Sequence, residues 1–382
     1  MYSGYFNYRS KTAESGLDRS IFVWNWWRIN ARDPHWVPPY YPGFRRELET
    51  RHNSHLARLD PIYVYLEALP RGTITGGRSP YPGSAPPALT GGYFEQAVAA
   101  AVILKDPRRR DGAGYLSLLH CTNDPESLER LISKAAELAF ETGSNSLIGP
   151  VGLSPYLESG LLQDHWDQVP PLYTAYNPPY LPEIARPLSE PLHSSRLFEL
   201  ALSPERTAAV QSGAQIDPLD PRRLGEDLLP LFAGSLSEGA ADPPPDAEEA
   251  SFLLRWISYW PIQAWLASID AQPAGFIILG PDLAPLLKRA RGGRNFFWRA
   301  WLRRAAGRPV RRGRILFGGV QPGSRGQGIG LQLFQHASNF ARDQGWENIT
   351  AGPVRQDSAA AGLLEHIGAR PCQSYQIVRW ET

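Results

Sequence analysis

A glycine-rich segment near the C-terminus has the residue types and spacing of a phosphate-binding loop. Residues 320–330 read Val-Gln-Pro-Gly-Ser-Arg-Gly-Gln-Gly-Ile-Gly. Glycine permits positive φ and close approach of backbone to a ligand, and the first N–H groups of a helix lack intrahelical partners. With the helix dipole behind them, such N–H groups suit a pyrophosphate, and Arg325 adds a positive charge.

The loop matches neither of two common nucleotide-binding motifs. A P-loop would end in Gly-Lys-Ser or Gly-Lys-Thr, and a dinucleotide fingerprint read from Gly328 and Gly330 would need glycine where Leu333 stands. No Gly-x-Ser-x-Gly segment is present, so nothing favours a serine hydrolase. The pattern indicates a different phosphate-bearing ligand.

The elements that must position this loop can be read from the flanking residues. The apolar run 315–320 predicts a buried strand, and Leu331, Phe334, Ala337 and Ala341 recur at helical spacing after the loop. Further along, we expect a strand over residues 348–354, a helix over 357–367 and a last strand over 375–380.

The segment Arg325-x-x-Gly328-x-Gly330 resembles the acyl-CoA signature of the GCN5-related N-acetyltransferase (GNAT) superfamily. The resemblance implies acetyl-CoA or another acyl-CoA as co-substrate, without a metal. It implies a strand that splays from its neighbour, with pantetheine in the gap and Val320 N–H facing the thioester carbonyl. The implied CoA-binding residues are Gly318, Gly319, Val320, Arg325, Gly326, Gln327, Gly328, Ile329 and Gly330.

Other segments resemble a bacterial group of tandem GNAT-like proteins, namely residues 33–39, 149–150, 176–180 and 280–283. The expected fold class is therefore α/β with a mixed α+β sheet, built from two tandem GNAT-like acyl-CoA N-acyltransferase domains. A length of 382 residues suits two domains, and proline and serine between residues 186 and 196 mark a boundary. We expect domains at 1–190 and 191–382. In the second, we expect a first strand at 197–202, helices at 224–236 and 247–260, and a hairpin of 264–269 with 274–279.

The first half shows similar elements without the loop. Residues 62–66, 97–104 and 114–120 predict strands, and 125–142 predict a helix. Where a CoA loop would lie, residues 121–125 read Cys-Thr-Asn-Asp-Pro, with neither glycine nor arginine. Asp124 would repel phosphate and suits a helix N-cap. We expect a degenerate first domain that binds no CoA.

The residues for proton transfer are less well marked. Many GNAT enzymes have a tyrosine that acts as general acid within a Leu-Tyr-x-x-x-Gly-Phe pattern. In this chain Leu364 occupies the position of that tyrosine. The candidate catalytic residues are Tyr375 as a proton donor, Asp357 to orient water or amine, and His366 as a group that titrates in the useful range. Each also has a structural interpretation: a strand aromatic, a helix N-cap and a solvated helix residue, respectively.

Two charged segments bear on partners. An acidic cluster precedes the expected helix at 247 and favours either a cationic amine acceptor or simple helix capping; it comprises Glu238, Asp242, Asp246, Glu248 and Glu249. Residues 288–314 hold ten arginines and Lys288 among aromatic residues. They could reach the CoA 3′-phosphate, bind RNA or form a solvated basic face, and a net charge of +1 makes a nucleic-acid partner unlikely.

The remaining observations narrow the function. His52-x-x-His55 has no further ligand at metal spacing, and two cysteines form no disulfide framework. No apolar run could span a bilayer, so we expect a cytoplasmic protein without a membrane partner. Our primary hypothesis is acyl-CoA-dependent N-acetyl (acyl) transfer to an amine of a small molecule or peptide, by direct attack on the thioester. The alternatives are a non-catalytic acyl-CoA sensor or scaffold and an aminoacyl-tRNA-dependent transferase.

Overall fold

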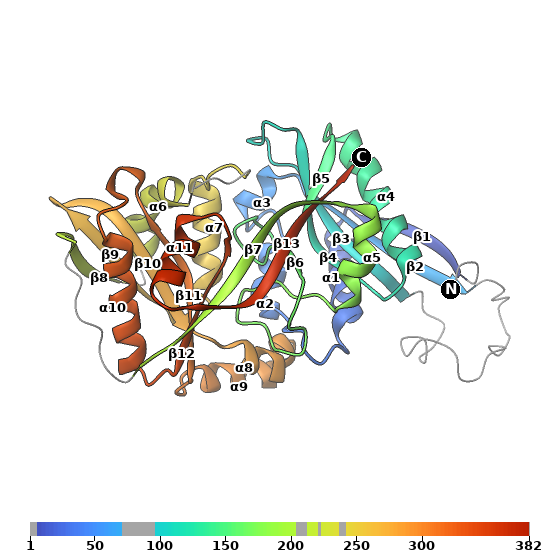
Figure 1. The fold of residues 1–382 in the computed structure, drawn as a ribbon. Helices are drawn as coiled ribbons and strands as arrows, with labels where there is room; N and C mark the ends of the chain where they lie inside the picture. The colour runs from blue at the N-terminus through green and yellow to red at the C-terminus, as the bar shows by residue number, and fades with distance from the viewer. Residues whose placement is uncertain (1–5, 71–95, 204–211, 221–222, 237–241, 382) are drawn as a thin grey trace.

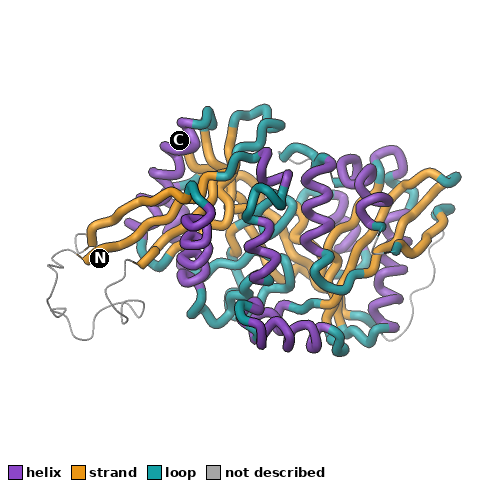
Figure 2. Tube along the Cα trace, turned by 180° about the vertical axis from the view of Figure 1, so that it is seen from behind, coloured by secondary structure: helices purple, strands orange, loops and turns teal. Residues whose placement is uncertain are grey.

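One mixed sheet runs through both halves of the protein. The computed structural model describes residues 6–70, 96–203, 212–220, 223–236 and 242–381. The strand order in the described part is β1-β2-β3-β4-β5-β13-β7-β12-β11-β10-β9-β8, with β6 beside β13. Helices lie on both faces of this sheet (Figures 1 and 2). The mixed α/β class expected from the sequence is confirmed.

The N-terminal half places most of its helices before its central strands. Its strands are β1 (Phe6–Ala13), β2 (Ile62–Pro70), β3 (Gln96–Leu104), β4 (Ala113–Cys121), β5 (Ser146–Val151) and β6 (Leu161–Leu162). Its helices are α1 (Gly16–Asn30), α2 (Tyr41–Glu47), α3 (Ser54–Arg58), α4 (Pro125–Glu141), α5 (Tyr180–Ala185) and the 3₁₀ turn η1 (Arg186–Leu188).

The C-terminal half also alternates strands with helices along the chain. Its strands are β7 (Glu190–Ala201), β8 (Gln215–Leu219), β9 (Gln263–Ile269), β10 (Gln272–Pro281), β11 (Arg312–Val320), β12 (Asn348–Arg355) and β13 (Arg370–Glu381). Its helices are α6 (Leu224–Ser235), α7 (Ala247–Ile257), α8 (Ala284–Arg289), α9 (Phe296–Ala306), α10 (Ile329–Asp343) and α11 (Ala359–His366), with 3₁₀ turns η2 (Arg291–Gly293) and η3 (Pro322–Ser324).

Two long strands, β7 and β13, join the halves at the middle of the sheet (Figure 1). β7 pairs with β12 and with β13, and β13 pairs on its other side with β5 of the N-terminal half. The last strand of the chain thus lies between strands of both halves. The inserted strand explains why the two halves share one sheet.

A gap opens between the parallel strands β11 and β12. Their pairing extends from Arg312 opposite Asn348 to Ile315 opposite Ala351 and then stops, although β11 continues to Val320 and β12 to Arg355. On its other side β11 stays paired with β10 as far as Val320. The splay that the family resemblance implied is therefore present.

Helices pack on the two faces of β10 and β11 according to strand alternation. Phe276 and Ile278 belong to the same core cluster as residues of α6 and α7, whereas Ile277 and Leu279 pack with residues of α10 and α11. Successive strand side chains point to opposite faces, which accounts for this division. The α6–α7 core also includes aromatic residues of the N-terminal half, such as Trp26.

Most elements expected from the sequence are present. The strand expected at 197–202 overlaps β7, which is the first strand of the C-terminal half along the chain but lies in the centre of the sheet. The edge position belongs to β8, which pairs only with β9 among the described strands. The boundary predicted at 190 falls on the first residue of β7 and stays a prediction. No helix of the described residues is long and apolar enough to cross a membrane.

Candidate active site

The glycine-rich loop ends at the N-terminus of α10. Gly326 and Gly328 adopt φ of 75° and 77°, and Gly328 is the N-cap of the helix without a side-chain capping bond. Ile329, Gly330 and Leu331 form the first turn of α10, and their N–H groups have no acceptor within the helix. Arg325 folds back so that its Nε donates to Val320 O at 3.1 Å. This arrangement suits an anion such as a pyrophosphate.

Strand β11 presents free backbone to the gap. Gln321 N–H donates to Ala274 O of β10, and peptide groups alternate along a strand, so the N–H groups of Gly318 and Val320 point away from β10 and toward the gap. Between them, a Cβ on Gly319 would lie 2.5 Å from Ser235 Cβ at the end of α6. Glycine at 319 therefore allows α6 to pack directly on this strand.

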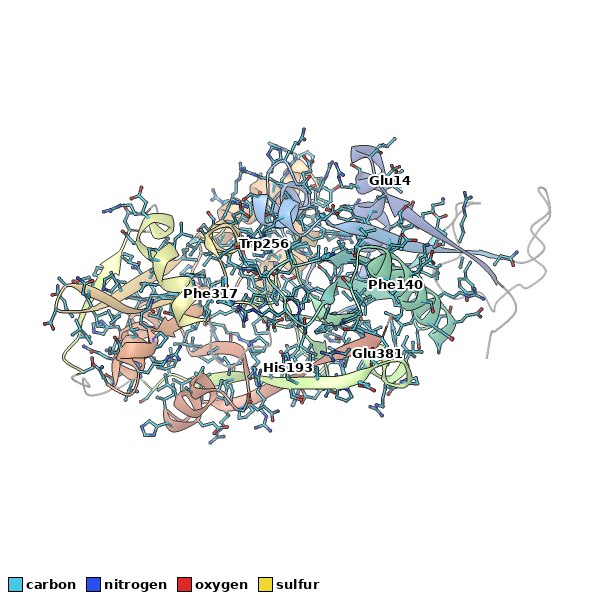
Figure 3. All side chains as sticks on the ribbon, turned by 90° about the horizontal axis from the view of Figure 1, so that it is seen from above. Glu14, Phe140, His193, Trp256, Phe317 and Glu381 are labelled. Atoms are coloured by element: carbon cyan, nitrogen blue, oxygen red, sulfur yellow. The ribbon has the colours of Figure 1, made fainter. Side chains whose placement is uncertain are left out.

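A cavity of about 670 Å³ fills the gap and extends into the N-terminal half. Most of its wall is apolar, and the side chains that form it include Leu157, Leu236, Ile257, Phe276, Leu316 and Phe317. Both His193 of β7 and Phe317 of β11 line the cavity; in Figure 3 His193 lies near the middle of the long axis of the molecule and Phe317 lies over the C-terminal half. Cavities of this size bury ligands much larger than an acetyl group.

The structure gathers the expected CoA-binding residues at one end of this cavity. Its wall contains Gly318, Gly319, Val320, Arg325, Gly326, Gly328, Ile329 and Gly330. Gln327 is exposed and does not line the cavity; its Nε2 donates to Gly323 O at 3.4 Å.

The three expected catalytic residues do not meet in the cavity. Tyr375 is 1% exposed, packs in a separate core cluster, and donates its hydroxyl to Gln373 Oε1 at 2.9 Å. Burial raises its pKa well above the usual value. Asp357 is exposed and paired with Arg355 at 2.8 Å, and His366 is exposed at the end of α11. None of the three lines the cavity.

Glu158 is a cavity residue that the motif analysis missed. It lies between β5 and β6, with a φ of 49°, and lines the cavity wall. Among the described residues, neither a hydrogen bond nor an ion pair holds its carboxylate. Burial raises the pKa of Glu158 to about 7, and the charge of Arg314 opposes this rise. A carboxyl group with this pKa can accept a proton near neutral pH.

Arg314 lies where β11 and β12 separate. Its side chain is buried, and Nη2 donates to Gly352 O at 2.6 Å, which satisfies a β12 carbonyl beyond the last paired residues. Nε and Nη1 have no hydrogen-bond partner in the part of the chain that the structure describes. Burial lowers the pKa of Arg314, as expected for a charge that is poorly compensated.

The described acidic residues around the start of α7 pair with arginines of the N-terminal half. Arg109 contacts Asp242 at 2.6 Å, Arg58 contacts Asp246 and Glu248, and Arg108 contacts Glu249 at 2.6 Å. Glu238 lies outside the described residues. Asp242 alone of the described four lines the cavity. Their main visible role is to hold the two halves together.

The arginine-rich segment forms a surface on α8, η2 and α9 at the lower edge of Figure 1. Arg303, Arg304 and Arg308 are exposed, and of the ten arginines only Arg314 lines the cavity. No described group of His, Cys, Asp and Glu is arranged to hold a metal ion.

The equivalent region of the N-terminal half is closed. Trp26 stacks on His120 with ring centroids 4.0 Å apart, and its Nε1 donates to Leu118 O at 2.7 Å. Both rings line a cavity of only about 80 Å³ next to β4 and β5. Asp124 is the N-cap residue of α4, but its carboxylate accepts from the hydroxyls of Tyr8 and Ser127 instead of capping the backbone.

Comparisons with known proteins agree with this geometry. Residues 227–369 match the family model described as "Acetyltransferase (GNAT) family". A tandem GNAT protein from the clavulanic acid biosynthesis pathway has a similar structure, with a TM-score of 0.55, 12% identity and 98% of both chains covered. A GCN5-related N-acetyltransferase from Anabaena variabilis gives a TM-score of 0.52 at 12% identity, over 97% of this chain and 72% of that one.

A curated relative covers nearly the full length. The bacterial ceramide synthase of Caulobacter vibrioides is 21% identical over 372 residues, which is 92% of this chain and 91% of the relative. The fold, the splayed strands and the family match lead to one conclusion: residues 227–369 match the GNAT family model within a chain whose fold is similar to that of a tandem GNAT protein.

Proposed function

We propose that this protein transfers an acyl group from acyl-CoA to an amine in the cavity between its two halves. The observation that carries the proposal is the splay of β11 from β12, with a glycine-rich helix N-terminus at its mouth. Arg325 and the loop N–H groups would hold the pyrophosphate. The free N–H groups of Gly318 and Val320 would bind pantetheine and the thioester carbonyl.

The apolar extent of the cavity supports a long-chain substrate. Beyond the expected pantetheine site, the wall continues with Leu316, Phe317 and Leu157. A ceramide is an amide of a fatty acid with a long-chain amino alcohol, so the relation to a ceramide synthase favours the same class. We therefore propose a long-chain acyl group, a long-chain amine, or both as substrates, in place of acetyl transfer to a small cation.

The test is thiol release from acyl-CoA donors of two to sixteen carbons with a long-chain amino alcohol as acceptor. We expect turnover with the longer donors. Arg325→Glu should weaken acyl-CoA binding by at least about tenfold in calorimetry, or about 1.4 kcal/mol. The exposed Arg308→Glu is the matched control and should bind normally. Tight acyl-CoA binding without turnover of any amine would instead favour the sensor, and tRNA binding without acyl-CoA binding would favour the tRNA-dependent transferase.

A further inference from the structure

Two ionisable side chains of the cavity wall, Arg314 and Glu158, have hydrogen-bonding capacity that the described residues do not use. Arg314 is 3% exposed and lines the cavity, and its Nε and Nη1 have no partner among the described residues. A buried guanidinium with unused donors is costly unless an oxygen ligand satisfies it. Its one hydrogen bond, to Gly352 O, fixes the side chain at the point where the strands separate.

Glu158 reaches the same cavity from the other half of the chain. The charge of Arg314 acts on it, and the carboxylate has no hydrogen bond or ion pair among the described residues. Other titratable groups also line the cavity. Tyr173 donates its hydroxyl to Trp256 O at 2.9 Å, and Asp242 is held by Arg109. Burial lowers the pKa of His193, which favours its neutral form, so His193 is the competing candidate base.

We propose that Glu158 and Arg314 form the acceptor subsite, which selects an amine carrying an oxygen on a neighbouring carbon. The inference rests on the proposed acyl transfer. Arg314 binds the oxygen through Nε and Nη1, and Glu158 receives a proton from the ammonium group. Amino alcohols and amino carboxylates share this chemistry, because the oxygen of either accepts hydrogen bonds from a guanidinium.

The reaction balances with the groups present. An ammonium group must lose two protons to become an amide nitrogen. Glu158 takes the first, which frees the nitrogen lone pair to attack the thioester carbon. The C–N bond forms, the C–S bond breaks, and the departing thiolate takes the second proton, so the products are the amide and the free thiol. The pKa of Glu158, about 7, suits the first transfer, because the carboxyl group is largely ionised above neutral pH.

The experiment compares three acceptors of equal chain length: an alkylamine, a 2-amino alcohol and a 2-amino carboxylate. For each, kcat/KM is measured for the wild type, Arg314→Gln, Arg314→Lys and the exposed control Arg308→Gln. We expect the wild type to prefer one oxygen-bearing amine by about 10–100-fold over the alkylamine, because the subsite leaves its donors unpaired with the latter. Arg314→Gln should reduce this ratio to about 3 or less, Arg314→Lys should retain part of it, and Arg308→Gln should keep it. Which of the two oxygen-bearing amines the wild type prefers shows whether the subsite selects an amino alcohol or an amino carboxylate.

A pH profile tests Glu158 separately. In the wild type, kcat/KM should rise with pH through about 7, as Glu158 ionises, and Glu158→Gln should lower it by about 10²–10⁴-fold and remove that rise. His193→Gln is the comparison variant. If it removes the rise and Glu158→Gln does not, Glu158 is not the base and the proposal is overturned.

A binding measurement separates this inference from the proposed function. Calorimetric titration of the same three amines needs no turnover, so it remains informative if acyl transfer is absent. Preference for an oxygen-bearing amine that is lost in Arg314→Gln supports the subsite even then. Equal binding of all three amines by the wild type, or a preference unchanged in Arg314→Gln, overturns the subsite while leaving acyl transfer standing. Normal acyl-CoA binding by each variant shows that the fold is intact.

Discussion

At the scale of single residues, the sequence predicted the loop that we propose as the donor side of the site, but not the residues that we propose for the acceptor side. The loop residues could be predicted because the spacing of the glycines indicates a backbone that approaches a ligand closely, and because Arg325 adds a positive charge to the loop. Glu158 stands in a loop with no motif around it, and its properties arise from burial and from Arg314, which is 156 positions away. A sequence does not show which distant segments bury one another, so neither Glu158 nor Arg314 could be predicted as a site residue. The same limit explains why Tyr375 looked available and is buried.

Glu158 should make stability depend on pH. Its pKa is about 7 in the folded protein and about 4.5 when unfolded, so the folded state holds more protons between these values. Stability attributable to this group therefore falls as pH rises from about 4.5 to 7, and the penalty is full above pH 7. Glu158→Gln avoids the ionised form and should be more stable than the wild type by about 1–3 kcal/mol at pH 8, with the gain shrinking toward pH 4.

Urea denaturation of both proteins at several pH values measures this difference. The exposed Glu137→Gln serves as a control that should show no such trend. A constant difference between wild type and Glu158→Gln across pH 4–8 would contradict the raised pKa.

At the scale of elements, periodicity located most strands and helices but not their neighbours. Residues 197–202 have a strand pattern, yet a pattern does not say whether the strand lies at an edge or in the centre. The insertion of β13 beside β5 is a pairing between segments more than 200 residues apart, which no local signal encodes. One repeated signal was present: Gly-Pro-Val occurs at 149–151 in β5 and at 352–354 in β12. It marks equivalent strands of the two halves.

The contact between β11 and α6 gives a test at this scale. An added Cβ in Gly319→Ala would lie 2.5 Å from Ser235 Cβ and 3.1 Å from Ser235 O, so α6 must shift. We expect a loss of about 1–3 kcal/mol in stability and weaker acyl-CoA binding, because the strand lines the cavity. Gly323→Ala is the matched control, since its added Cβ meets nothing within 4 Å. Equal effects of the two substitutions on thermal unfolding and calorimetry would refute this account of the contact.

At the scale of the whole molecule, charge pairs and the shared sheet hold the two halves as one body. The acidic cluster before α7 looked in the sequence like a solvated or ligand-binding loop. Its partners, Arg58, Arg108 and Arg109, all belong to the other half. Since the cavity wall takes residues from both halves, this interface also sets the distance between Glu158 and β11. The first half therefore contributes residues to the cavity wall, and that it binds no CoA itself stays a prediction.

The pair of partly buried Arg108 and fully buried Glu249 should dominate that interface. Glu249 is 0% exposed, and it accepts from Arg108 at 2.6 Å and from Ser154 at 2.7 Å. Arg108→Met leaves this carboxylate buried without its cation and should cost about 3–5 kcal/mol of stability. The neighbouring Arg110→Met is the matched control, because Arg110 is exposed, and it should change stability by less than about 0.5 kcal/mol.

The double variant Arg108→Met/Glu249→Leu distinguishes a lost ion pair from a stranded charge. Arg108 also contacts the buried carboxylate of Asp106 at 2.6 Å, so Arg108→Met strands two carboxylates. Replacing Glu249 as well removes one of them, so part of the stability should return relative to Arg108→Met alone. Chemical denaturation of the wild type, Arg108→Met, Arg110→Met and the double variant supplies the free energies of unfolding. A double variant no more stable than Arg108→Met would mean that packing of the Arg108 side chain, and not the buried charge of Glu249, joins the two halves. In that case, replacing Glu249 with a neutral residue should cause little loss of the proposed acyl transfer.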